Sequence, residues 1–263
     1  MVPRRLLLGF LFTLGAVVFL MAANVKAAGP TPVISRAFRV VIDPGHGGSN
    51  EGCQAHDGEG REKELTLDIA RRVRRRLGDE LPHAEVILTR EGDVTMTLAE
   101  RVAFANQTEA DLFLSIHANA SPEKNQRGYE TYVLDTEANS LESARTAQRE
   151  NDEGFIAPPS ADPVATMLRE LHLTQNRARS ARFANLLQAE QGRRFPERLD
   201  RGVRTAPFDV LMGARMPAVL HEVGFLDHAE EGRFIDSEFG REQLAASIAE
   251  AVVRYYNAAG LER

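Results

Sequence analysis

Two histidines that follow apolar segments offer the clearest chemistry in this sequence. His46 lies in the stretch FRVVIDPGHGG (residues 38–48), where a β-branched run is stopped by the turn sequence DPG. His117 ends the apolar segment LFLSIH (residues 112–117) and precedes a small polar turn. In open α/β sheets, ligands bind at the carboxyl ends of the strands. Two histidines at that edge therefore predict a metal site.

A hydrolytic zinc site needs a further ligand and a base. It usually has three protein ligands of mixed imidazole and carboxylate type, and the ion lowers the pKa of a bound water to about 7. We expect the third ligand at the start of the following helix, where Glu62 and Glu64 both qualify; their spacing does not decide between them. Glu222 ends another apolar segment, so we expect it at the same edge as an unliganded general base and acid.

Each of these residues also has a structural interpretation. A histidine at a strand end often only caps a hydrogen bond, a glutamate at a helix start favourably opposes the helix dipole, and Glu222 can pair with an arginine. His221 points to the opposite side of its strand from Glu222, because side chains alternate, so we expect it to be structural or supporting. The other histidines receive no assignment: His56, His83, His172 and His228. The prediction rests on the combination of residues.

Strands that alternate with helices are needed to position these side chains. Besides the two segments above, apolar patterns predict strands at 84–89 and 128–134, and a further strand with the turn that follows it at 217–226. Helices are predicted from Arg61 onward, at 98–106 with a capping box of Thr97 and Glu100, at roughly 163–191, and at 238–258. The alternation predicts an α/β fold of three layers, a mostly parallel twisted sheet with helices on both faces, as in phosphorylase/hydrolase-like proteins.

The N-terminus has the pattern of an export signal. Arg4 and Arg5 precede an uncharged apolar run of 18 residues, and a small-residue cleavage site follows at 25–27. We therefore interpret residues 1–27 as a signal peptide and expect the protein in the periplasm or cell envelope. A retained membrane anchor is the alternative, because the run is near the lower limit for a span. The paired arginines also allow twin-arginine export.

Composition and charge limit the domain organisation and the binding partners that the remaining chain can have. Its 263 residues are 43% hydrophobic and 27% charged, which fits one sizeable domain, predicted at 37–263 behind a linker at 28–36. Loss of residues 1–27 removes three positive charges and moves the net charge from −6 to −9, which argues against a nucleic-acid partner. Cys53 is the single cysteine, so no internal disulfide is expected. We expect a monomer.

The ordered motifs resemble the zinc-dependent N-acetylmuramoyl-L-alanine amidases of the Amidase_3 type, the bacterial cell-separation amidases. The similarity covers nearly all of residues 37–259, in the stretches VVIDPGHGG (40–48), REKELTLDIA (61–70), VILTREGD (86–93), LAERVAFAN (98–106), ADLFLSIHANA (110–120), RGVRTAPFDVL (201–211) and MPAVLHEVGFL (216–226). The resemblance implies one Zn²⁺ per chain, bound by His46, Glu62 and His117, with Glu222 as the catalytic glutamate. It favours Glu62 over Glu64.

The resemblance also implies a reaction. These enzymes hydrolyse the amide between N-acetylmuramic acid and the L-alanine of peptidoglycan stem peptides, in wall remodelling and daughter-cell separation. Two other functions fit the same residues: a non-catalytic peptidoglycan-binding module that kept the fold, and a zinc peptidase that acts elsewhere on the stem peptide. A pure binding module has no physical need for Glu222 beside an open metal position.

An insertion at residues 135–160 implies regulation. Several cell-separation amidases carry an inserted helix there that plugs the active site, and the glutamate of an Arg-Glu-Asn segment takes the open metal position. This chain has Arg149-Glu150-Asn151, so Glu150 is the candidate inhibitory ligand; a solvated surface glutamate is the alternative. A plug implies a partner that displaces the helix. In the family such partners are periplasmic proteins with degenerate endopeptidase-like domains.

Only a short linker precedes the domain, so we expect no extra N-terminal targeting domain.

Overall fold

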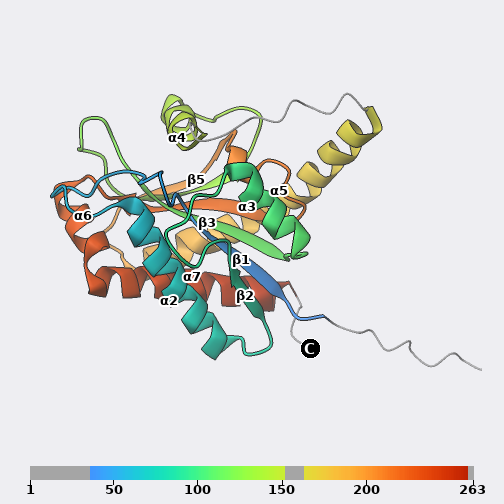
Figure 1. Ribbon diagram of the computed structural model, residues 1–263, viewed down its shortest axis with the longest axis horizontal. Helices are drawn as coiled ribbons and strands as arrows, with labels where there is room; N and C mark the ends of the chain where they lie inside the picture. Colours follow the sequence, from blue (N-terminus) through green and yellow to red (C-terminus); the bar gives the residue numbers. More distant parts are fainter. Residues whose placement is uncertain (1–35, 152–162, 260–263) are drawn as a thin grey trace, which may run out of the picture. The chain divides into compact units, whose positions relative to one another are not determined.

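In the part of the chain that this computed structural model describes, residues 36–151 and 163–259, six strands form one sheet in the order β2-β1-β3-β6-β4-β5 (Figure 1). For residues 163–175 only the course of the backbone is described. The strands are β1 (Arg39–Pro44), β2 (Glu85–Leu88), β3 (Leu112–Asn119), β4 (Tyr129–Leu134), β5 (Asp200–Ala206) and β6 (Ala218–Phe225). Four of them, β2, β1, β3 and β6, run parallel, whereas β4 pairs antiparallel with β6 and parallel with β5. The predicted mostly parallel sheet is confirmed.

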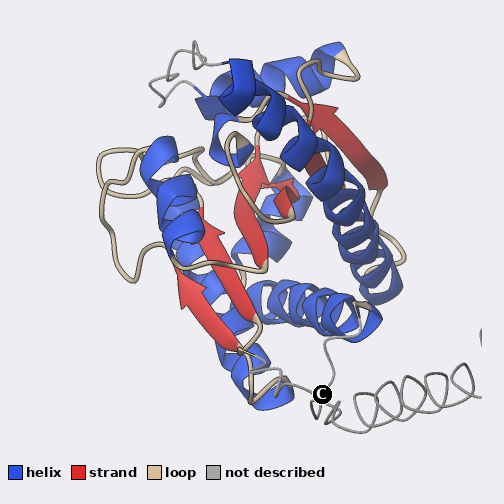
Figure 2. Ribbon diagram, turned by 90° about the vertical axis from the view of Figure 1, so that its right-hand side faces the viewer, coloured by secondary structure: helices blue, strands red, loops and turns tan. Residues whose placement is uncertain are grey.

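Helices cover both faces of this sheet (Figure 2). They are α2 (Glu62–Glu80), α3 (Leu98–Gln107), α4 (Leu141–Asn151), α5 (Pro163–Arg194), the 3₁₀ turn η1 (Asp209–Leu211), α6 (Ala229–Asp236) and α7 (Glu238–Ala258). On one face, apolar side chains of α2, α5 and α7 pack against strand residues such as Val40 and Ile42. On the other, α3 and η1 pack around Val41 and Phe113. Neighbouring strand residues thus enter different cores, as expected of a sheet buried on both faces.

Most predicted elements match the structure. The capping box at α3 is present, since the Thr97 side chain accepts from the Glu100 backbone N–H and the Glu100 carboxylate accepts from the Thr97 backbone N–H at 2.8 Å. Helix α7 has the predicted bounds, and α5 extends three residues beyond them. Strand β5 and helix α6 were not predicted. The strand is a half-exposed edge strand of sequence DRGVRTA, and apolar periodicity does not detect such a segment.

Two strands continue past the points where we expected them to end. His117 lies within β3, which runs to Asn119, and Glu222 lies within β6, which runs to Phe225. The prediction that both residues mark strand ends is therefore wrong by two to three residues. Their Cα atoms are partners across the two strands, with a register shift just after His117. Buried polar residues interrupt the apolar runs of β3 and β6, and the sequence pattern therefore placed the turn after each strand too early.

The N-terminal predictions remain untested. The signal peptide, its alternative as a membrane anchor and nearly all of the linker lie outside the described residues. Within the described ranges, no helix combines the length and apolar character that crossing a bilayer needs. By their contacts, the described residues from Ala37 to Ala259 form one compact unit.

A buried ion pair lies just below the turn after β1. The side chains of Asp43 and Arg101 are 0% and 1% exposed, and Nη1 of Arg101 lies 2.8 Å from Oδ1 of Asp43. Asp43 also accepts hydrogen bonds from the hydroxyls of Thr89 and Ser115. Burial raises the pKa of Asp43, but Arg101 and these donors outweigh it, and the net pKa is lowered. The carboxylate is therefore charged in the folded protein.

The turn itself depends on two arginines. Arg101 donates to the carbonyls of Pro44 and His46, and Arg90 donates to those of Pro44 and Gly45. A buried backbone carbonyl that leaves the sheet ladder needs another donor. The arginines supply these donors, and in this way they fix the position of His46.

We expect Asp43→Ala to lower the free energy of unfolding by about 3–5 kcal/mol, because it leaves the buried Arg101 guanidinium without its counter-ion. Urea denaturation followed by circular dichroism measures this change. Asp79→Ala is the control: Asp79 is exposed near the end of α2, and its replacement should stay within about 0.5 kcal/mol. Equal effects of the two substitutions would contradict the assigned role of the pair.

Candidate metal centre

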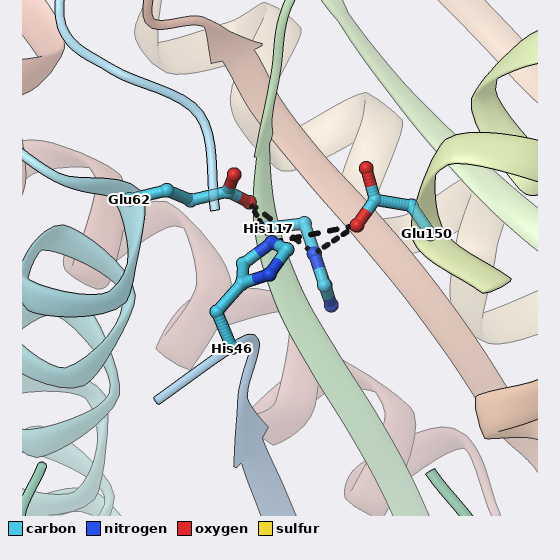
Figure 3. A group of neighbouring side chains, drawn as sticks. All are labelled: His46, Glu62, His117 and Glu150. Carbon is cyan, nitrogen blue, oxygen red and sulfur yellow. Dashed lines mark ion pairs between the residues drawn. The ribbon is translucent and has the colours of Figure 1, made fainter. Parts of the chain in front are cut away.

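Four side chains from separate elements converge at the carboxyl edge of the sheet (Figure 3). His46 follows β1, Glu62 opens α2, His117 lies in β3, and Glu150 is near the end of α4. All four are between 1% and 6% exposed. One nitrogen or oxygen atom of each lies within 4.8 Å of those of the others. Glu62 and Glu150 approach the two imidazoles from opposite sides, so the group can enclose a metal ion.

The distances fit a small divalent cation. Nε2 of His46 lies 2.9 Å from Oε1 of Glu62 and 3.4 Å from Oε2 of Glu150. Nδ1 of His117 lies 3.2 and 3.1 Å from the same two oxygens. Four ligands about 2.0–2.2 Å from a zinc ion in a tetrahedron are separated by about 3.3–3.6 Å. Two imidazoles and two carboxylates in this arrangement suit zinc.

Further contacts hold the ligand atoms in place. The Oδ1 atom of Asn50 lies 3.1 Å from Nδ1 of His46, which orients that ring so that Nε2 faces the centre. Glu62 accepts the backbone N–H of Cys53 on one oxygen and that of Ala118 on the other, both at 2.9 Å. The start of α2 is thereby attached to β3, next to His117.

The turn that carries His46 is conformationally special. His46 has φ of 60°, a left-handed conformation that residues other than glycine seldom adopt and that marks strained functional sites. The preceding Gly45 packs against the ring of His117: a Cβ atom there would lie 2.4 Å from the imidazole. The glycine is thus required for the two histidines to approach each other.

Burial and charge set the protonation of the cluster. Burial raises the pKa of Glu62, yet His46 and His117 outweigh it, so this pKa is well below its usual range. The pKa of Glu150 is likewise lowered, since His117 outweighs its burial. Burial would lower the pKa of His117, but the charge of Glu150 raises it to about 10. The two carboxylates are therefore anionic in the folded protein, as metal ligands must be.

Glu222 lies beside this group in a different environment. It is fully buried across from His117, and within the described residues neither of its carboxylate oxygens has a hydrogen-bond partner. Burial, followed by the charges of Glu150 and Glu62, raises its pKa well above the usual range. A carboxyl group that is buried, unpartnered and shifted in this way has the properties of a group that exchanges protons.

The amino-acid sequence that contains this cluster also shows to which protein family the chain belongs. Residues 40–254, most of the chain, match the family model Amidase_3, described as N-acetylmuramoyl-L-alanine amidase. The chain belongs to this family.

Individual members of the Amidase_3 family resemble the chain over most of its length. It is 35% identical to the amidase AmiC of Neisseria meningitidis over 229 residues, which are 85% of this chain and 54% of AmiC. Identity to LytC of Bacillus subtilis is 34% over 238 residues, 89% of this chain and 39% of LytC. Identity to AmiA of Escherichia coli is 30% over 222 residues, which are 83% of this chain and 76% of AmiA. The chain spans about half or less of the length of AmiC and LytC.

Solved structures of amidases share the fold. The catalytic domain of CwlV from Bacillus (Paenibacillus) polymyxa is 29% identical, with a TM-score of 0.62, and the match covers 84% of this chain and 98% of that one. An amidase of Clostridium difficile is 28% identical, with a TM-score of 0.64, and the match covers 85% and 99%. These likenesses agree with the sheet and helices described above.

The structure brings together all five residues that the sequence singled out in this Amidase_3 chain. Glu62 is 1% exposed and points to the histidines, whereas Glu64, two residues later, is exposed and outside the cluster. Glu150 is buried rather than solvated, which contradicts the alternative of a surface glutamate. Glu222 lies beside the group, as expected.

Three further polar residues of the site were not singled out. Arg149 bonds its neighbour Glu150 at 3.1 Å and donates to Oδ1 of Asn119 at 2.6 Å. Asn119 in turn donates to the buried Glu130 in β4 at 2.8 Å. The one available signal was Glu130 itself, the second residue of the strand YETYVL, because a carboxylate in a buried strand needs a partner.

His221 has the structural role that we expected. Its Nδ1 lies 2.9 Å from the hydroxyl of Thr131 in β4, and its Nε2 lies 2.6 Å from Oε1 of Gln191 in α5. It faces away from the metal cluster and joins three elements. Burial lowers the pKa of His221 to about 3, so the ring is neutral.

This pKa predicts a specific loss of stability in acid. The unfolded chain takes up a proton at His221 below about pH 6.5, whereas the folded protein does not, so the free energy of unfolding falls as the pH decreases from about 6.5 towards 3. The slope attributable to this residue approaches ~1.4 kcal/mol per pH unit. We expect His221→Gln to flatten the slope between pH 6.5 and 4.5 in urea titrations. The exposed His83, replaced in the same way, should leave the slope unchanged.

Proposed function

We propose that this chain is a zinc-dependent N-acetylmuramoyl-L-alanine amidase. It hydrolyses the amide between N-acetylmuramic acid and the L-alanine of peptidoglycan stem peptides. The observation that carries this proposal is the buried cluster of His46, Glu62 and His117 with the unpartnered Glu222 beside it. Membership of the Amidase_3 family supports the choice of bond. Export to the periplasm or cell envelope and a role in daughter-cell separation are part of the same proposal.

Each residue has a defined task in this reaction. His46, Glu62 and His117 would hold the ion, and the contacts of Glu62 to two backbone N–H groups fix its carboxylate beside the histidines. A zinc ion held there would supply a water of pKa about 7 and would polarise the scissile carbonyl. Glu222 accepts a proton from the attacking water and returns it to the nitrogen of the leaving amine. Its raised pKa favours the form that returns the proton.

The proposal includes an inhibitory role for helix α4. A catalytic zinc site needs one position open for water or substrate. Glu150 offers its Oε2 atom to both histidine nitrogens and takes that position from within the chain. Activity therefore requires displacement of α4, and we propose that a periplasmic activator protein binds the displaced form of the 135–160 insertion and shifts the equilibrium towards it.

The role of Glu222 is tested by Glu222→Gln. We expect the variant to bind zinc normally but to lose about 10²–10⁴-fold in activity, because the amide cannot transfer the proton. The assay is release of stem peptides from purified wall sacculi, read by mass spectrometry, beside zinc content by elemental analysis. His117→Ala, in contrast, should lose the metal too. An active Glu222→Gln enzyme would refute the assignment. Cleavage of a different stem-peptide bond would identify a peptidase instead.

The plug is tested by Glu150→Ala. We expect at least about tenfold faster release of stem peptides than from the unaltered chain, because one ligand position becomes open to water. Gln148→Ala is the control, since Gln148 is exposed on the same helix. The inhibitory role of α4 would be wrong if both variants had the activity of the unaltered chain.

A further inference from the structure

The first turn of α4 has its own pair of cationic partners. Glu142 contacts Nη2 of Arg201 through Oε1, and its Oε2 lies 3.0 Å from Nη1 of Arg204. Both arginines belong to β5. Each also has its Nε atom 2.9 Å from Oε2 of Glu130, a residue that is fully buried in β4. The side chains of Arg201 and Arg204 are only 10% and 17% exposed.

The charges in this cluster balance only while α4 is in place. Two arginines face two glutamates, but Glu130 belongs to the sheet whereas Glu142 belongs to the helix that must leave. Burial raises the pKa of Glu142, and the two arginines outweigh it and lower the net pKa. Displacement of α4 takes the Glu142 carboxylate away from the two arginines and uncovers them, with Glu130 as the one carboxylate left in this cluster. The cluster then carries a net positive charge, to which another anion of suitable geometry can bind.

The arginine pair lies close to the reacting groups. The Cα atom of Glu130 is the cross-strand partner of that of Glu222, so both side chains project from the same face of the sheet. Asn119, two residues beyond His117, donates to Glu130. Glu142 and Glu150 are eight residues apart on one helix, a rise of about 12 Å. The helix positions that carry the carboxylate on the arginines and the carboxylate at the metal position are therefore about 12 Å apart along the axis.

We propose that Arg201 and Arg204 form a subsite for a carboxylate of the stem peptide. In the inhibited state α4 then imitates the substrate twice, with Glu142 on the arginines and Glu150 at the metal position. A separation of about 12 Å corresponds to three to four residues of extended peptide. The subsite therefore takes a carboxylate on the third or fourth residue after the scissile amide. This inference rests on the proposed amidase function and adds the group that the enzyme recognises.

The chemistry of arginine favours this ligand. Guanidinium groups form paired, charge-assisted hydrogen bonds with carboxylates, which a carboxamide reproduces only in part. The third residue of a stem peptide carries a free carboxylate when the peptide ends there, and chemical amidation removes its charge with little change in size.

The test compares two substrates in one opened enzyme. We would use the full chain with Glu142→Gln and Glu150→Ala, loaded with zinc, and two N-acetylmuramoyl tripeptides, one ending in a carboxylate and one in a carboxamide. We expect kcat/KM to be about 10- to 100-fold higher for the carboxylate, mainly through a lower KM. Calorimetry should show the same preference when the free tripeptide products bind.

Arg204 is then replaced in this opened enzyme. Arg204→Gln should reduce the preference to about twofold with unchanged zinc content, and Arg204→Lys should retain part of it, because the charge remains but the paired geometry does not. Arg72→Gln is the matched control: Arg72 is 16% exposed and paired with Glu242 on the face of α2, and its loss should leave the preference intact.

The outcomes separate the two proposals. Equal cleavage of both tripeptides by the opened enzyme would overturn the subsite and leave the amidase standing. Cleavage of neither would overturn the amidase and the subsite together. A preference for the carboxylate that survives Arg204→Gln at full strength would place its recognition elsewhere. If Arg204→Gln does not fold, Arg204→Lys replaces it in this test. A preference for the carboxylate that is as strong in Arg204→Lys as in the opened enzyme would then place its recognition elsewhere.

Discussion

The compensation of buried negative charge is the constraint on which this structure depends. Asp43, Glu62 and Glu130 are all inside the protein at or near one edge of the sheet. Asp43 is compensated by Arg101, Glu130 by two arginines of β5, and Glu62 by imidazoles and backbone N–H groups. Each compensation joins elements that are distant in sequence. The turn after β1, the start of α2 and strand β5 are therefore positioned by charge as much as by apolar packing.

The same constraint is compatible with the proposed role of α4 as an inhibitor that can be displaced. Its buried residues are small or polar: Ser143, Thr146, Ala147 and Glu150. Its end is held by Asn151, which bonds the carbonyl of Pro207 and the backbone N–H of Asp209. Polar contacts of this kind are exchanged for water or for a partner at a net change of about 0.5–1.5 kcal/mol each. Ala147 is the one residue of this eleven-residue helix that belongs to an apolar core cluster, so the helix itself contributes little apolar surface to the core.

The sequence predicted the sheet and the histidines because both are local patterns. The glycines around His46 and the apolar runs before both histidines are visible in short windows. Spacing did not separate Glu62 from Glu64, because the helix phase depends on how the loop at 49–60 folds back onto β3. The conformation of this loop depends on contacts such as the hydrogen bond from the Ala118 N–H to Glu62, which are 56 residues apart in the sequence. Only the family resemblance distinguished the two.

Strand β5 shows why part of the site could not be predicted. Strand prediction depends on apolar alternation, and β5 has charged residues at positions where an edge strand usually has apolar ones. Those residues include Arg201 and Arg204, whose partner Glu130 is about 70 residues earlier in the chain. The charges that obscured the strand are the ones that pair with Glu130 in the sheet and with Glu142 in α4. Residues that violate the local pattern of an element are therefore where function should be sought first.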